Sequence, residues 1–206
     1  MSIKKIGITG PSGSGKSTLC DYLAARGIPT INADTVYHSM LVKDSPCTLA
    51  LANEFGADIL SPEGTPDRKR LGAIVFSSEE RLEKLNEIVL KFVIDEINQM
   101  ISVLEAEGHK SVMLDAPTLI ESGFNKECDA VVSILAPISD RVCRICARDG
   151  ITEEAALLRV KAQKPDEFYK KHSDMVIVND SGEDALYLLA DELMKTVFTV
   201  GVTDEQ

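Results

Sequence analysis

The hydrophobic positions near the start of the chain predict strands and helices in alternation. Residues 3–9 form an apolar run rich in isoleucine, which is typical of a buried strand. A glycine-rich segment follows, and residues 16–26 then carry apolar side chains at helical spacing. A second extended run, residues 29–32, closes at Ala33-Asp34. Two strands joined through one helix by short connections indicate a βαβ unit and a parallel sheet.

The middle of the chain has a different pattern. From about residue 42 to residue 108, apolar side chains recur at intervals of three and four residues, which predicts helices. The periodicity is strongest over residues 82–101 and predicts one long amphipathic helix there. We therefore predict a helical insertion, residues 43–106, in a core formed by residues 1–42 and 107–206.

The last part of the chain returns to strands alternating with helices. Residues 110–115, 130–135 and 175–179 are apolar runs typical of buried strands. Two helical stretches rich in arginine and lysine, residues 139–149 and 152–164, precede the last of these strands, and a closing helix runs from residue 183 to about residue 198. The predicted fold class is α/β, with a parallel central sheet flanked by helices and a helical segment at about 138–168.

Composition excludes several classes of protein. A chain of 206 residues with 44% hydrophobic and 27% charged residues is typical of one globular domain, with or without an insertion. The net charge of −11 argues against nucleic acid as a partner, because backbone binding needs a basic surface. We find neither an apolar run long enough for a bilayer nor a signal peptide, so we expect a cytoplasmic protein without a membrane partner. The five cysteines are expected to be reduced thiols.

The strongest chemical signal is the glycine-rich segment. It reads Gly10-Pro11-Ser12-Gly13-Ser14-Gly15-Lys16-Ser17 and fits G-x-x-x-x-G-K-[ST] between a strand and a helix, the context that a P-loop requires. Small residues let backbone N–H groups converge on a phosphate at the positive end of a helix. Lys16 would reach the β- and γ-phosphates, and the Ser17 hydroxyl could ligate Mg²⁺. The alternative is a glycine-rich turn without a ligand.

Three carboxylates are candidates for chemistry beside this loop. Asp34 closes the second predicted strand, at the sheet edge where open α/β folds bind ligands, and could take the proton of an acceptor hydroxyl. The alternative is that Asp34 only caps the following helix. Asp115 ends an apolar run, as a Mg²⁺-binding Walker B carboxylate does, although a strand-end turn gives the same pattern. Glu121 is interpreted as a substrate contact or a helix cap.

Arginines and a histidine complete the candidate residues. Arg141, Arg144 and Arg148 lie at positions i, i+3 and i+7, which places them on one helix face. Guanidinium groups that close over a nucleotide stabilise the charge of a transferring phosphoryl group, so this helix is predicted to be a lid. The alternative is a solvated helix face paired with neighbouring aspartates. His38, one turn after Asp34, is the one histidine near the predicted site.

An ordered set of residues makes the sequence similar to the dephospho-CoA kinase family over nearly the whole chain. The early part of the set is Ile6-Gly7-Ile8-Thr9-Gly10, Gly13-Ser14-Gly15-Lys16-Ser17-Thr18, Ala33-Asp34 with His38, Phe55-Gly56-Ala57-Asp58-Ile59-Leu60, Gly64, Asp67-Arg68, Leu71, Val75-Phe76 and Leu85-Asn86. The later part is Leu114-Asp115-Ala116-Pro117, Leu119, Glu121, the helix from Arg144 to Arg148 with Asp149, Arg159, Gln163, and Asp174 before Val176-Ile177-Val178-Asn179.

The resemblance implies a P-loop kinase that transfers the γ-phosphate of ATP to the ribose 3′-hydroxyl of dephospho-CoA with Mg²⁺. Asp34 would match the catalytic aspartate, Arg144 and Arg148 the lid arginines, and Asn179 a residue beside the adenine. His38, Pro117 and Glu121 are the expected acceptor contacts, and the helical insertion would hold the CoA-like substrate. We expect a monomer or small homo-oligomer. The alternatives are a kinase of another hydroxylated acceptor, such as a nucleoside, and a nucleotide-binding protein without turnover.

The chain also departs from the family pattern. Asn32 stands where the family usually has the first of two aspartates around an alanine, which removes one charge. Leu90-Lys91 replaces a typical His-Pro pair, Thr118 replaces a leucine, and Pro11-Ser12 replaces Gly-Ile in the loop. These departures bear more on the acceptor substrate than on ATP.

Overall fold

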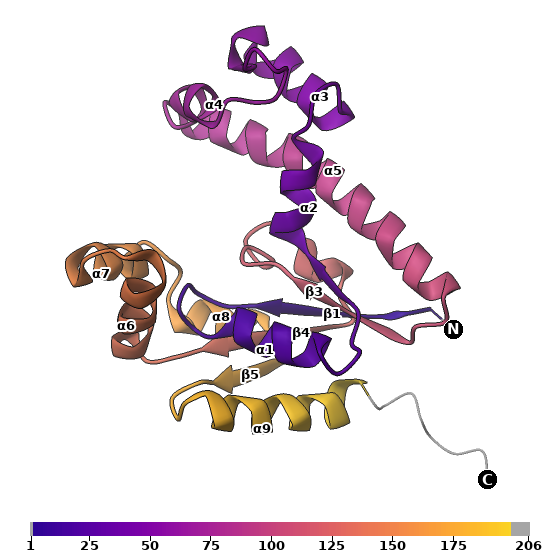
Figure 1. Cartoon of the computed structure of the whole chain (residues 1–206), viewed down its shortest axis with the longest axis vertical. Coiled ribbons are helices and arrows are strands. Elements are labelled where there is room, and N and C mark those ends of the chain that lie inside the picture. The colour runs from indigo at the N-terminus through magenta and orange to yellow at the C-terminus, as the bar shows by residue number, and fades with distance from the viewer. Residues whose placement is uncertain (1, 199–206) are drawn as a thin grey trace. The chain divides into compact units, whose positions relative to one another are not determined.

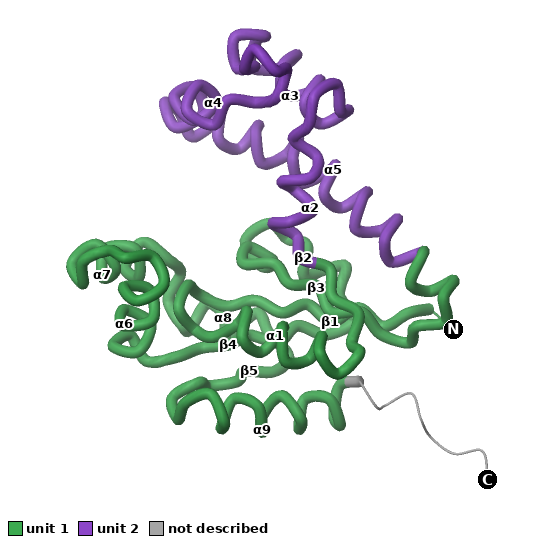
Figure 2. The backbone as a smooth tube through the Cα atoms, in the orientation of Figure 1, with its two compact units in different colours: residues 1–31, 103–206 green, residues 32–102 purple. Residues whose placement is uncertain are grey.

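The computed structural model describes residues 2–198 of the chain. The chain divides into two compact units, which Figure 2 shows in different colours. One unit comprises the residues up to Ile31 together with those from Val103 on, and the other comprises Asn32–Ser102. The boundary differs from the predicted one, because the first helix after Asn32 packs against the next helix of the second unit.

The strands of the described residues form one five-stranded sheet in the order β2-β3-β1-β4-β5 (Figure 1). The β1–β3, β1–β4 and β4–β5 pairs are parallel, and β4 is buried along almost its whole length. A near-continuous apolar run suits a strand of a parallel sheet that is covered on both faces. The predicted α/β fold class is confirmed. The strands are β1 (Lys4–Thr9), β2 (Thr30–Asn32), β3 (Ser111–Asp115), β4 (Ala130–Leu135) and β5 (Met175–Val178).

Helices α1 and α9 pack together against the sheet and close the main hydrophobic core. Leu19 and Leu23 of α1 and Leu186 of α9 lie in one buried cluster with Ile6 and Ile134 of the strands. These side chains recur at three- and four-residue spacing on each helix, which gives each helix one buried stripe. The helices of this unit are α1 (Lys16–Ala24), α6 (Ile138–Asp149), α7 (Glu153–Lys161), α8 (Asp166–His172) and α9 (Glu183–Leu193), with short helical turns η2 (Phe124–Glu127) and η3 (Met194–Phe198).

The second unit consists of helices with their own small core. Its helices are α2 (Ala33–Met40), α3 (Pro46–Phe55), the turn η1 (Ala57–Ile59), α4 (Arg68–Val75) and most of α5 (Glu79–Ala106). Side-chain caps start three of them: Asn32 for α2, Ser45 for α3 and Asp67 for α4. The core contains Leu51, Ile59, Cys47, Leu71 and Val75. No helix among the described residues has the length and apolar character that crossing a membrane requires.

Three local predictions differ from the structure. Asp34 does not end a strand: β2 stops at Asn32 and Asp34 lies in the first turn of α2. The predicted helix 152–164 ends at Lys161, and a separate helix, α8, follows Pro165. The closing helix changes at Met194 from α to π geometry. Each difference lies at an element boundary, where residue patterns are least informative.

Candidate active site

The predicted P-loop lies between β1 and α1, at the carboxyl edge of the sheet. Ile8 of β1 pairs with Asp115 of β3, so the start of the loop and the end of β3 are neighbours. The Thr9 hydroxyl donates a hydrogen bond to the carbonyl of Pro117 at 3.1 Å. The predicted site residues Asp115 and Pro117 therefore lie beside the root of the glycine-rich loop.

The start of α1 provides backbone N–H groups. The first N–H groups of a helix lack partners within it. The N-cap residue is Gly15, and no side chain caps this end of the helix. These groups and the helix dipole make the loop a site for an anion. Ser17 in this first turn is exposed, and Thr18 beside it is partly exposed.

The carbonyl groups of the loop contact polar side chains from α6 and from the end of β5. Arg141 Nε donates to the Ser12 carbonyl at 3.0 Å, and Arg144 donates to the Gly13 carbonyl at 3.1 Å. The amide of Asn179 donates to the Ser14 carbonyl at 2.8 Å. Because the negative ends of these peptide groups face N–H donors, the loop is well suited to present positive dipoles to a ligand.

Lys16 and Asp115 form a largely buried ion pair. The ammonium of Lys16 contacts Oδ1 of Asp115, and the two side chains are 11% and 7% exposed. The sequence predicted a phosphate-binding lysine and a metal-binding carboxylate at these positions, and the structure places the two groups together.

The donor set for a metal ion here is small. No group of three or more His, Cys, Asp or Glu side chains that could hold a metal occurs among the described residues. Mg²⁺ prefers oxygen ligands and commonly combines one or two protein ligands with water and substrate phosphates. The Asp115 carboxylate and the Ser17 hydroxyl fit such a shared site.

The three arginines of α6 differ in burial. The Arg141 side chain is 3% exposed, that of Arg144 is 33% exposed and that of Arg148 is 59% exposed. Arg148 donates to both carboxylate oxygens of Asp149, at 2.7 and 2.9 Å, and one of its nitrogens lies 3.4 Å from the Ser12 hydroxyl. Hydrogen bonds from Arg148, together with Arg159, lower the pKa of Asp149 to about 2. Arg144 and Arg148 thus contact both the loop and nearby aspartates.

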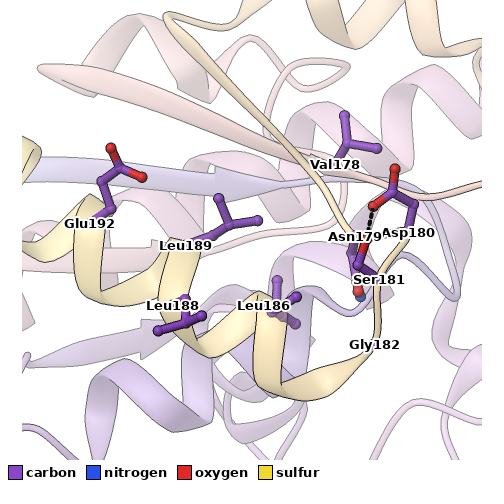
Figure 3. A pocket seen from close by; sticks show the side chains of 10 residues that line it. Val178, Asn179, Asp180, Ser181, Gly182, Leu186, Leu188, Leu189 and Glu192 are labelled. Atoms are coloured by element: carbon purple, nitrogen blue, oxygen red, sulfur yellow. Dashed lines mark hydrogen bonds between the residues drawn. The ribbon is translucent and has the colours of Figure 1, made fainter.

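Asn179 follows β5 and lines a cavity of about 280 Å³ against α9 (Figure 3). The side chain of Asn179 is buried, and its Oδ1 has no hydrogen-bond partner within the described structure. Leu186, Leu188 and Leu189 line the α9 side of the cavity. The Oδ1 atom is itself buried, so the apolar side chains of α9 are what this cavity presents to a flat ligand.

Glu121 is held by a buried tyrosine. The Tyr169 hydroxyl of α8 lies 3.4 Å from Oε1 of Glu121, to which it donates. Burial, together with the nearby Glu121 carboxylate, raises the pKa of Tyr169 to about 12, so the hydroxyl stays protonated. Glu121 itself is exposed.

The remaining candidates, Asp34 and His38, lie in the second unit. Both side chains are exposed on α2. The side chain of Asn32 caps this helix by accepting the N–H of Thr35 at 2.8 Å, so Asp34 is not the capping residue. His38 Nδ1 lies within hydrogen-bond distance of the Asp34 carbonyl, which can only accept, so Nδ1 carries the proton. Asn32 stands where the family usually has an aspartate, and it preserves the N-cap of α2 because Asn caps helices as well as Asp does.

Two residues of the site region had no role in the sequence prediction. Gln163 accepts the N–H of Ser12 and a hydrogen bond from Arg141, and Tyr169 contacts Glu121. Gln163 was already part of the family resemblance, but no local pattern indicated its partners. Only three residues separate Tyr169 from Pro165, so the sequence offers too little helical periodicity to identify Tyr169 as buried.

Comparisons with known proteins cover almost the whole chain. A family model for dephospho-CoA kinase matches residues 4–184. A dephospho-CoA kinase from Corynebacterium glutamicum is 34% identical over 195 residues, which span 95% of this chain and 98% of that protein. The crystal structure of TT1252 from Thermus thermophilus superimposes with a TM-score of 0.79 at 30% identity, covering 96% of this chain and 100% of that one. A dephospho-CoA kinase structure from Campylobacter jejuni, with a TM-score of 0.70 at 24% identity over 96% and 98% of the two chains, shares the fold.

Proposed function

Because the chain belongs to the dephospho-CoA kinase family, we propose that it phosphorylates the 3′-hydroxyl of dephospho-CoA with ATP, giving coenzyme A and ADP. The acceptor oxygen forms a bond to the γ-phosphorus while the bond from that phosphorus to the bridging oxygen of ADP breaks. The observation that carries this proposal is the P-loop, whose Lys16 lies beside Asp115 at the carboxyl edge of a parallel sheet. Such an arrangement suits phosphoryl transfer.

The nucleotide end of the proposed site consists of the loop from Gly10 to Thr18 with groups that surround it. The backbone N–H groups at the start of α1 would hold the β-phosphate, and Lys16 would bridge the β- and γ-phosphates. Arg144 and Arg148 would stabilise the charge that spreads over the transferring group. Asn179, which lines the cavity against α9, is proposed to lie beside the adenine.

Ser17 and Asp115 are the residues that would hold Mg²⁺. When bound, the ion neutralises charge on the β- and γ-phosphate oxygens. The protein contributes a hydroxyl at the start of a helix and a carboxylate at the end of a strand, so the backbone that carries both groups is already ordered.

The acceptor end is proposed to involve Asp34, His38, Pro117 and Glu121. The carboxylate of Asp34 takes the proton from the 3′-hydroxyl as the new bond forms. Its exposure supports this role, because a base must be accessible to the substrate, and the capping function belongs to Asn32. The helical unit Asn32–Ser102 is the proposed domain for the CoA-like part of the acceptor.

The reaction is tested by ADP release from the purified protein with ATP, Mg²⁺ and dephospho-CoA. The product mass should show one added phosphate. Asp34→Asn should lower turnover by roughly 10²- to 10⁴-fold, the range for a general base, while ATP binding is retained. Asp95→Asn is the control, because Asp95 is an exposed carboxylate on α5 of the same unit. A loss below threefold in Asp34→Asn would contradict the assigned base.

Lys16→Met tests the nucleotide end separately. The phosphates lose their ammonium partner, so we expect ADP affinity to fall at least tenfold in a calorimetric titration. Unchanged affinity would refute the P-loop assignment. ATP binding without transfer to dephospho-CoA would instead point to another acceptor or to a protein without turnover, and a panel of nucleosides would separate these two results.

A further inference from the structure

The guanidinium of Arg141 is buried, whereas the side chains of Arg144 and Arg148 on the same helix are 33% and 59% exposed. The Arg141 side chain is 3% exposed, and two of its nitrogens donate hydrogen bonds, from Nε to the Ser12 carbonyl at 3.0 Å and from a terminal nitrogen to Oε1 of Gln163 at 2.7 Å. A third nitrogen lies 4.0 Å from Asp166. Because the side chain is buried and faces Ser12, Gln163 and Asp166, Arg141 does not present its charge to a phosphate.

Gln163, Arg141 and Ser12 form a ring of hydrogen bonds, in which Ser12 takes part through its N–H and its carbonyl. Oε1 of Gln163 accepts from Arg141 and also from the backbone N–H of Ser12 at 3.1 Å. Ser12 is therefore held at both its N–H and its carbonyl. Gln163 follows α7 and its own N–H donates to the Val160 carbonyl at 3.2 Å, which fixes its backbone. One amide oxygen thus connects the P-loop with α6 and α7.

The backbone of Arg141 also touches the loop. A Cβ added to Gly13 would lie 2.7 Å from the carbonyl oxygen of Arg141 and 2.9 Å from its Cα, closer than side-chain atoms pack. Gly13 has φ of +79°, which glycine adopts without strain. This contact is independent of the guanidinium, so two different observations place the first turns of α6 firmly against the loop.

We propose that Arg141 and Gln163 are a positioning pair that holds the P-loop in its phosphate-binding shape. The inference rests on the proposed nucleotide-binding role of the loop. Neither side chain touches the nucleotide. Their effect is to keep the Ser12 peptide groups fixed before the nucleotide binds, so that binding does not have to order the loop. Burial lowers the pKa of Arg141, and the nearby Asp166 carboxylate opposes this effect. An arginine guanidinium stays charged in proteins, and hydrogen bonds from a charged donor are strong.

Substitutions of Gln163 separate positioning from general stability. Gln163→Leu removes the shared acceptor, and Gln163→Glu keeps an oxygen for both donors. We expect Gln163→Leu to weaken ADP binding by about ten- to a hundredfold, the effect of losing hydrogen bonds to a buried charge. Gln163→Glu should restore affinity to within about threefold of the wild type. The KM for ATP should rise in Gln163→Leu with the KM for dephospho-CoA unchanged. Lys161→Leu, an exposed position at the end of α7, is the matched control.

A double-substitution cycle tests whether the two residues act as one unit. If Arg141→Met and Gln163→Leu both act through Ser12, the double variant should lose little more ADP affinity than the weaker-binding single variant. Independent effects would multiply, and that result would overturn the pair. The Gln163 variants test the inference even where Arg141→Met fails to fold.

The outcomes distinguish this inference from the proposed function. ADP binding does not depend on the identity of the acceptor, so a different acceptor leaves the test intact. A wild-type protein that fails to bind ADP would overturn the nucleotide role of the loop, and the positioning pair with it. A wild-type protein that binds ADP, with equal affinity in Gln163→Leu and a lowered melting temperature, would show a purely structural role and overturn the pair alone.

Discussion

Substituting Gly10 tests how closely the first residue of the P-loop approaches strand β4 of the sheet. Gly10 has φ of +147°, in a region that other residues rarely adopt, and an added Cβ would lie 3.2 Å from both the carbonyl carbon and the nitrogen of Ile134 in β4 and still closer to its carbonyl oxygen. The backbone conformation costs about 1–3 kcal/mol in a residue other than glycine. Displacing a buried strand costs about another 1–3 kcal/mol. Gly10→Ala should therefore lower the free energy of unfolding by about 2–6 kcal/mol.

The control for this prediction is Gly27→Ala. Gly27 has φ of +86°, but nothing lies within 4 Å of an added Cβ, so only the conformational cost of about 1–2 kcal/mol applies. Urea unfolding followed by circular dichroism measures both variants, and the difference between them isolates the close approach of Gly10 to β4. If Gly10→Ala destabilises the protein no more than Gly27→Ala, the loop does not begin where the structure places it.

Three further predictions concern stability and thiol chemistry. Asn32→Ala should lower the free energy of unfolding by about 1 kcal/mol through loss of the α2 cap, and Asn32→Asp should be close to neutral in urea unfolding. Burial and the nearby Asp115 raise the pKa of Cys20 from 9.0 to about 12. The contribution of the Cys20 thiol to the free energy of unfolding is therefore complete below pH 9 and declines as the pH rises toward 12. The free energy of unfolding is measured at pH 8, 9 and 10.5. Above pH 9 it should fall with each pH unit by about 1.4 kcal/mol more in wild type than in Cys20→Ala. Equal slopes in the two proteins would contradict the raised pKa. Cys143 is exposed, so a maleimide should label it well before Cys20, as peptide mass mapping would show.

The fold class and the loop were predictable because their signals are local. The strand before Gly10, the glycine-rich segment and the helix after Lys16 lie within about two dozen residues, and hydrophobic periodicity reports each of them. The start of α2 was misplaced for a local reason as well. Asn32 is both the last residue of β2 and the cap of α2, so the extended run continues into the helix without a separating turn.

The contacts of the site were not predictable to the same degree. Helical spacing correctly placed Arg141, Arg144 and Arg148 on one face, but it contains no information about the depth to which each is buried. Burial depends on what packs against α6, and the partner Ser12 lies 129 residues away from Arg141 along the chain. The link between Ser12 and Gln163 spans 151 residues. The pairing of β1 with β4 brings the loop and α6 together.

The acidic character of the chain makes the arrangement around the loop physically important. With a net charge of −11, long-range attraction does not favour an anionic nucleotide, so affinity has to come from groups near the phosphates. Several of the basic side chains near the loop donate to backbone carbonyls, as Arg141 and Arg144 do, and Lys16 is paired with Asp115. Donors on the carbonyl side of the peptide groups polarise them, so the N–H groups at the start of α1 become better donors. The phosphate site therefore depends on the order of its hydrogen-bonded backbone at least as much as on the number of positive charges near it.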